Sequence, residues 1–173
     1  MKKVFSRNED YRKIAFVNWR ISTTDQIVNL LNLADGFLLS SSELLKVCLH
    51  NNADKKADIV IFPILFNLNH GIELYLKSLN WILNKLLDYN RDIEGSHNIL
   101  QLYNMIHSKF KKYQGNIKSR DFILATKDLK IYIDELYEKI EATELNSKMD
   151  FLDIHLVKGK IMKIIFTQKQ QRM

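Results

Sequence analysis

The 173-residue sequence contains one cysteine, one proline and five glycines. Because Cys48 is alone, no internal disulfide or cysteine-rich metal site can form, and its place in an apolar helical pattern predicts a buried thiol. So few glycines and prolines leave few natural turns or strand breaks, while Leu, Ile, Lys, Asn and Glu are abundant. This composition favours helices.

Several motifs of catalytic and metal-binding proteins are also missing. His50, His107 and His155 lack the spacing of a zinc site, and the sequence has no Asp-x-Asp or His-x-x-x-His pair. There is no glycine-rich phosphate loop and no Gly-x-Ser-x-Gly sequence. We therefore expect neither a metal ion nor a cofactor, and nucleotide hydrolysis and acyl transfer are disfavoured.

The sequence lacks a long uninterrupted apolar run. Met1 to Asp10 is charged, and the longest weakly polar run, Ile59 to Ile72, is too short to span a bilayer and is interrupted by two asparagines and a histidine. We therefore expect a cytoplasmic protein that does not contact membranes. The 46% hydrophobic and 27% charged fractions are those of a globular protein, and 173 residues suit a single core.

Positive charge exceeds negative charge. The formal net charge is +6 and the isoelectric point is about 9.3. Basic side chains gather in short clusters such as Lys109 to Lys112 and Lys158 to Arg172. Basic patches attract polyanions because binding releases counterions from phosphates. The excess is modest, however, and an ordinary solvated surface explains most such clusters.

The periodicity predicts a mainly helical, all-α fold, a bundle of four to five helices over residues 23–145. The first helix is expected to start at the capping-box spacing after Thr23 and to reach Leu49. Asp58 to Tyr89 is expected to be one long central helix, because it is apolar around most of its circumference. Pro63 is tolerated only in or near a first turn, which moves the expected start towards Phe62.

Two further helices are expected, one over His97 to Tyr113 with Ser96 as its cap, and one over Ser119 to Glu141 with a coiled-coil-like seam that begins at Phe122. This seam and the central helix offer apolar surface for a homodimer. Val157-Lys158-Gly159 predicts the turn of a small β-hairpin within residues 146–166, followed by a disordered tail at 167–173. Residues 1–22 are assigned no structure, because their apolar stretch Ile14 to Trp19 could begin a helix or form a short strand.

A narrow stripe of polar residues runs along the central helix, at steps of mostly three or four residues. It comprises Asn69, His70, Glu73, Lys77, Asn80 and Asn84. Buried charges are costly unless paired, so Glu73 and Lys77 could satisfy each other, with the asparagines at the surface. Alternatively, the stripe lines a cleft against the next helix. The polar side of that helix comprises His97, Gln101, Asn104 and Ser108.

Two segments resemble those of a known superfamily. Phe62 to Leu79 contains Glu-Leu-Tyr-Leu-Lys-Ser-Leu, which is similar to the Glu-Leu-x-Leu-Lys-x-Leu helix of HEPN (higher eukaryote and prokaryote nucleotide-binding) proteins of bacteria. Gly95 to Leu102 is similar to the Gly-His-Asp-Leu-x-x-Leu helix start that follows it there. With its flanking helices, the resemblance covers roughly residues 25–141.

The resemblance implies an antiparallel helical bundle and a role in a toxin-antitoxin, phage-defence or RNA-processing system, with RNA and a cognate antitoxin as expected partners. HEPN nucleases pair an Arg with a His four to six residues later, across a homodimer, to cleave RNA without a metal ion. Arg91 and His97 match this spacing. They differ in position, because His97 falls in the Gly-His element rather than at the start of the last bundle helix.

In this interpretation His97 is the general acid or base at the ribose 2′-hydroxyl, and Arg91 neutralises the scissile phosphate. The alternative for His97 is a ring that bonds backbone or Glu73. The alternative function is a non-catalytic interaction module for a nucleotide, small ligand or protein. Its expected binding residues are Asn69, His70, Glu73, Lys77, Gln101 and Asn104.

Overall fold

The computed structural model describes residues 6–16, 20–91 and 96–145, with the side chains of 140–145 left aside. Its helices are a short 3-10 helix η1 (Tyr11–Lys13), α1 (Gln26–His50), α2 (Ala57–Leu86), α3 (Ile99–Lys112), α4 (Ser119–Ala125) and α5 (Lys127–Leu145). The prediction of a mainly α-helical protein is confirmed, and these ranges contain no strand. The predicted β-hairpin and tail lie outside the described residues.

Helix α1 begins two residues later than the capping-box spacing predicted. Asp25 is the N-cap, and its side chain accepts hydrogen bonds from the backbone N–H groups of Ile27 and Val28. A carboxylate at this position satisfies the free N–H groups of the first turn, so Thr23 is not needed as a cap. Farther along α1, Ser41 is buried and faces α2, where its Oγ donates to the Ile64 carbonyl at 2.9 Å.

Helix α2 begins at Ala57, so the expectation of a start near Phe62 is wrong, and Pro63 lies in the second turn. Proline cannot donate the hydrogen bond that the carbonyl of Ile59 would otherwise accept. Ile59 is 76% exposed, so water can take the place of that donor. The position of the proline on the uncovered part of the helix explains why α2 tolerates it.

Helices α1 and α2 form an antiparallel pair that packs tightly at Gly71. A Cβ atom at Gly71 would lie 2.7 Å from Leu38 Cδ2 and 3.2 Å from the carbonyl oxygen of Ala34. Leu38 is buried and Ala34 is fully buried, so neither neighbour can move away easily. The two helices can therefore pack this closely only because Gly71 has no side chain.

We expect Gly71→Ala to lower the free energy of unfolding by about 1–2 kcal/mol, because the overpacking exceeds the gain of up to about 1 kcal/mol in helix propensity. Gly36→Ala in α1 is the matched control, because its Cβ would meet no atom within 4 Å. That substitution should raise stability by up to about 1 kcal/mol. Urea unfolding measures both, and equal stability of the two variants would contradict the close contact.

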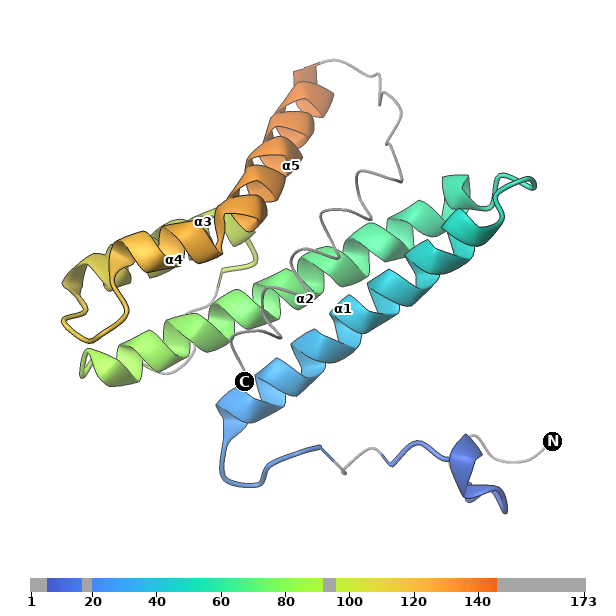
Figure 1. Ribbon diagram of the computed structural model, residues 1–173, viewed down its shortest axis with the longest axis horizontal. Coiled ribbons are helices and arrows are strands. Elements are labelled where there is room, and N and C mark those ends of the chain that lie inside the picture. The colour runs from blue at the N-terminus through green and yellow to red at the C-terminus, as the bar shows by residue number, and fades with distance from the viewer. Residues whose placement is uncertain (1–5, 17–19, 92–95, 146–173) are drawn as a thin grey trace.

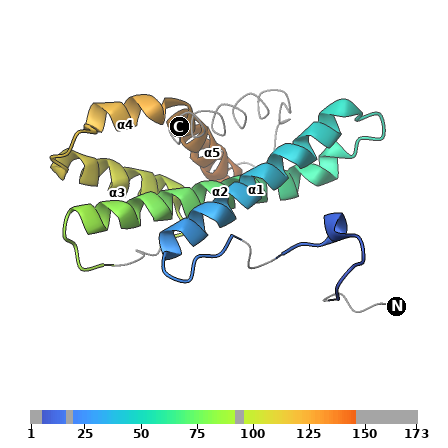
Figure 2. The same ribbon diagram turned by 60° about the horizontal axis from the view of Figure 1, so that its bottom comes forward.

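Helix α3 runs in the same direction as α2, as Figures 1 and 2 show. His97, just before α3, contacts Glu73, while Lys109 near its end contacts Asn84. An up-and-down order would have reversed this pairing, so the antiparallel arrangement expected for these two helices is wrong. Residues 87–98 provide the physical reason, because a connection of this length can return the chain along α2 before α3 begins.

Helix α2 is therefore the central helix, with α1 on one side and α3 on another. It is also the one helix, among the residues the structure describes, whose length and apolar composition would suffice to cross a membrane. The core helix of a folded domain has the same composition when it is covered on several sides. Its buried residues include Ile64, Leu68, Ile72 and Leu76.

The predicted helix from Ser119 to Glu141 is two helices, α4 and α5, divided at Thr126. The Thr126 hydroxyl donates to the Phe122 carbonyl at 2.7 Å and lies 2.9 Å from the hydroxyl of Tyr103 in α3. The predicted seam packs against other helices of the same chain, since Phe122 and Ile133 are buried and Phe122 stacks on Phe110 of α3. These two seam residues are thus not available as the predicted dimer surface.

Candidate functional site

The polar stripe of α2 is buried in its C-terminal half, where it packs against α3. Asn80 and Asn84 are almost fully buried, so the alternative that placed the asparagines at the surface is wrong for these two. Their side-chain oxygens accept hydrogen bonds from Lys109 Nζ at 2.7 and 2.5 Å. Lys109 is itself buried, and its ammonium also lies 5.8 Å from the ring centre of Tyr89. This part of the stripe holds α3 on α2.

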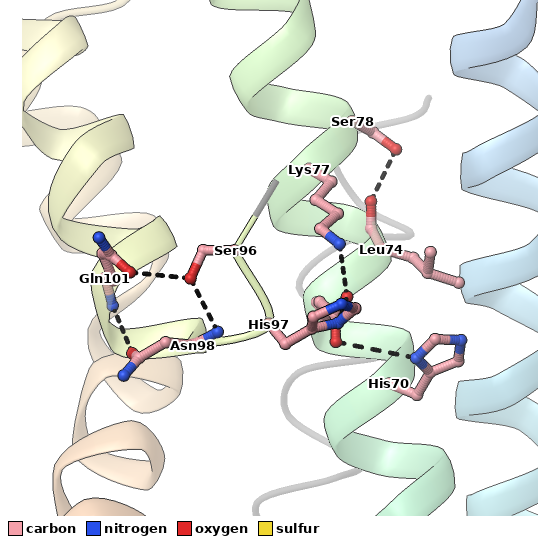
Figure 3. A network of polar contacts seen from close by, with 9 residues as sticks. His70, Leu74, Lys77, Ser78, Ser96, His97, Asn98 and Gln101 are labelled. Carbon is pink, nitrogen blue, oxygen red and sulfur yellow. Dashed lines mark hydrogen bonds and ion pairs between the residues drawn. The ribbon is translucent and has the colours of Figure 1, made fainter. Parts of the chain in front are cut away.

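Glu73 is the centre of the more accessible part of the stripe. Its carboxylate is largely buried, and Oε1 accepts a hydrogen bond from Lys77 Nζ at 2.7 Å. The same oxygen lies 3.1 Å from Nδ1 of His97, and Oε2 lies 3.8 Å from Nδ1 of His70. His70, Lys77 and His97, which are labelled in Figure 3, therefore all contact this one carboxylate. Pairing with Lys77, as the stripe predicted, makes the buried charge tolerable.

His97 lies in the turn that leads into α3. Asn98 is the N-cap of that helix and accepts a hydrogen bond from the Gln101 backbone at 2.8 Å, so the predicted cap Ser96 is replaced. Ser96 Oγ instead accepts from the Asn98 N–H at 3.0 Å. These bonds fix the backbone on either side of His97. Its side chain is 91% exposed although one ring nitrogen is bound to Glu73.

His70 lies one helical turn before Glu73, and its ring is held by aromatic side chains. Phe37 of α1 makes an edge contact with it at 4.4 Å between ring centres, and Phe66 stacks on it at 5.9 Å. The His70 side chain remains 34% exposed. The two histidines thus contact different oxygens of one carboxylate, and both rings reach solvent.

Gln101 and Asn104 do not face the stripe, contrary to the prediction, because both are exposed. Helix α3 turns its apolar face, including Leu102 and Ile106, towards α2. Gln101 is used locally, since its side-chain oxygen accepts a hydrogen bond from Ser96 Oγ at 2.8 Å. A helix whose core residues recur at steps of three and four leaves these two positions on its outer side.

Asn69 contributes to the packing of α5 rather than to an open site. Its side-chain oxygen accepts a hydrogen bond from the Tyr132 hydroxyl at 2.6 Å. Tyr132 is buried, and burial raises the pKa of its phenol above the usual range. The partners are 63 positions apart in the sequence. No local pattern marks this pair, so sequence analysis missed it.

We expect Tyr132→Phe to lower stability by about 1 kcal/mol at neutral pH, because the Asn69 oxygen loses its donor. The raised pKa of Tyr132 means that the native state holds the phenol proton more tightly than the unfolded chain. This contribution is fully present below about pH 10 and is lost as pH rises further. Urea unfolding at pH 8 and at pH 10.5 should therefore show a larger alkaline loss for the wild type than for the variant.

Arg91 and His97 contact α2 at different positions along its length. The carbonyl of Arg91 accepts a hydrogen bond from the side-chain amide of Asn84 at 3.1 Å, whereas His97 is bound at Glu73. At the α-helical rise of about 1.5 Å per residue, these two positions lie about 16 Å apart. The number of residues between Arg91 and His97 does not give the direction in which the chain between them runs. Their spacing in the sequence therefore does not predict that the two side chains meet.

Within the described ranges, no group of three or more His, Cys, Asp or Glu side chains has an arrangement that could hold a metal ion. The chain matches no protein-family model, no curated protein and no solved structure. The chemistry of the Glu73 cluster is therefore the basis on which a function is inferred.

Proposed function

We propose that the protein binds RNA where His97 is exposed and cleaves it without a metal ion, as a HEPN-like endoribonuclease. One observation supports this most: a largely buried carboxylate, Glu73, holds Nδ1 of a histidine whose side chain is 91% exposed. A carboxylate in this position fixes the tautomer and direction of an imidazole, which is how histidines are prepared for proton transfer.

The reaction follows from this tautomer. With Nδ1–H donating to Glu73, the lone pair on Nε2 of the neutral ring is open to solvent. Nε2 takes the proton of a ribose 2′-hydroxyl, and the 2′-oxygen attacks the adjacent phosphorus. The bond from phosphorus to the 5′-oxygen breaks, which gives a 2′,3′-cyclic phosphate and a free 5′-hydroxyl once that oxygen gains a proton.

Charge supports RNA as the substrate. The net charge of +6 attracts a polyanion to the surface. Arg91, which is exposed at the other end of the buried stripe, is suited to contact a phosphate distant from the cleaved one. The resemblance to HEPN proteins favours a toxin-antitoxin or phage-defence setting in the cytoplasm, with a cognate antitoxin that restrains the activity.

The second candidate function is a non-catalytic module that binds a nucleotide or another anionic ligand at His97. It is favoured by the internal use of the stripe, because Asn69, Asn80 and Asn84 all bond within the chain. At the Glu73 cluster, the two histidines and the exposed edge of Lys77 then remain for a ligand. This function would require RNA or nucleotide binding without strand cleavage.

A direct test incubates the purified chain with labelled single-stranded RNA in excess EDTA. We expect cleavage that ends in cyclic phosphates, and a fall of about 100-fold or more in His97→Gln. His50→Gln is the matched control, because His50 is exposed in the last turn of α1, away from Glu73. RNA binding without cleavage would support the second candidate, and failure to bind RNA would overturn the proposal.

A further inference from the structure

We infer that His70 is the second proton-transfer group of this site, the general acid that protonates the leaving 5′-oxygen while His97 acts as the base. This inference rests on the proposed cleavage and adds to it, because it assigns the acid to a residue outside the Arg91 and His97 pair.

The chemistry requires such a group. In a cleavage without a metal ion, a proton donor has to neutralise the alkoxide that forms when the bond from phosphorus to the 5′-oxygen breaks. Arg91 cannot supply the proton, because a guanidinium does not give one up in proteins. Its backbone is also held at Asn84, at the other end of the buried stripe. Lys77 is bound to Glu73 and its side chain is only 12% exposed.

The position of His70 beside His97 suits this role. An in-line displacement places the base and the acid on opposite sides of phosphorus, so the two groups must be close without touching. His97 contacts Oε1 of Glu73 and His70 contacts Oε2, which separates the two rings by one carboxylate. The His70 contact of 3.8 Å is too long for a hydrogen bond and attracts only a protonated ring.

The surroundings of His70 keep the ring in place and leave an edge open. Phe37 of α1 and Phe66 of α2 contact it from two directions, and Glu73 is the charged group that faces it, with Lys77 on the far side of that carboxylate. Phe66 is 64% exposed. Its outer surface, beside the acid, is suited to stack with the base of the leaving nucleoside.

The test compares two substrates whose leaving groups differ. One set is dinucleoside monophosphates, which need an acid because a 5′-alkoxide leaves. The other set is the four nucleoside 3′-(4-nitrophenyl phosphates), whose nitrophenolate leaves without a proton. We expect His70→Gln to lose about 100-fold or more on the first set and to keep the second within a few-fold. His97→Gln should lose activity on both sets, because the base is needed in each case.

The pH dependence gives a readout that a merely structural role would not change. The wild type should show a bell-shaped profile of kcat/KM on dinucleotides, and His70→Gln should lose the alkaline fall, which marks deprotonation of the acid. His70→Asn, checked by circular dichroism for helix content, is a second variant in case the glutamine substitution disturbs the fold.

The outcomes separate the two proposals. If His70→Gln and His70→Asn cleave dinucleotides at the wild-type rate, the acid is not His70, while the proposed function stands. Equal losses on both substrate sets by a folded variant would also overturn the acid role. If the wild type cleaves neither set, the cleavage function itself is wrong and this inference is lost with it.

Discussion

Replacing Lys109 with methionine is expected to lower the free energy of unfolding by about 3 kcal/mol. The side chain is buried between α2 and α3, and its ammonium donates to the side-chain oxygens of Asn80 and Asn84 at 2.7 and 2.5 Å. Methionine fills a similar volume but leaves both buried oxygens without this donor. The loss therefore comes from the two broken hydrogen bonds rather than from a cavity.

Lys111→Met is the matched control, because Lys111 is exposed on the same helix. It should change stability by less than about 0.5 kcal/mol. A triple variant with Lys109→Met, Asn80→Leu and Asn84→Leu should recover part of the loss, since it also removes the two side-chain oxygens to which Lys109 donates. The recovery should be incomplete, because the Arg91 carbonyl loses the hydrogen bond from the Asn84 amide. A loss below about 0.5 kcal/mol for Lys109→Met alone would show that the ammonium is not needed to hold α3 on α2.

Lys109 also shows where sequence reasoning reached its limit. The residue belongs to the basic cluster Lys109 to Lys112, for which a solvated surface is the ordinary interpretation. Its burial depends on the register of α3 against α2, which is seen in the contacts of His97 with Glu73 and of Lys109 with Asn80 and Asn84. A pattern on one helix does not contain this information, so Asn80 and Asn84 were identified as polar positions while their buried partner was not.

The parts of the site that could be predicted are those defined within one helix. Steps of three and four residues placed Glu73, Lys77 and His70 on one face of α2, and the pairing of Glu73 with Lys77 follows from the same spacing. For His97, the contact with Glu73 was one of two alternatives, and the other was a catalytic pair with Arg91. The choice between them required the direction of α3, because an antiparallel helix would have placed its start near Asn84 instead.

The break at Thr126 was missed for a similar reason. The apolar steps from Phe122 to Ile133 fit a continuous helix, and nothing in that stretch is a strong helix breaker. The division instead accompanies a tertiary contact, the pair of hydroxyls on Thr126 and Tyr103 at 2.9 Å. Local propensity is a weak guide wherever a side chain from another helix offers a competing hydrogen bond.

The second large effect is expected at Glu73. We expect Glu73→Gln to lower stability by about 2 kcal/mol and to lower RNA cleavage by about 100-fold. The amide can still accept a hydrogen bond from Lys77, but it no longer neutralises an ammonium whose side chain is only 12% exposed. It also no longer stabilises the positive charge that His97 gains when it takes a proton. Urea unfolding and the EDTA cleavage assay measure the two losses separately.

Glu43→Gln provides a matched control for the ion pair. Glu43 and Lys46 have the same 2.7 Å separation as Glu73 and Lys77, but both side chains are more than half exposed. An exposed pair contributes little, so this variant should change stability by less than about 0.5 kcal/mol and leave cleavage unchanged. If Glu73→Gln loses stability but cleaves at the wild-type rate, the carboxylate serves only the packing of α2 and α3. The orientation of His97 would then need another cause.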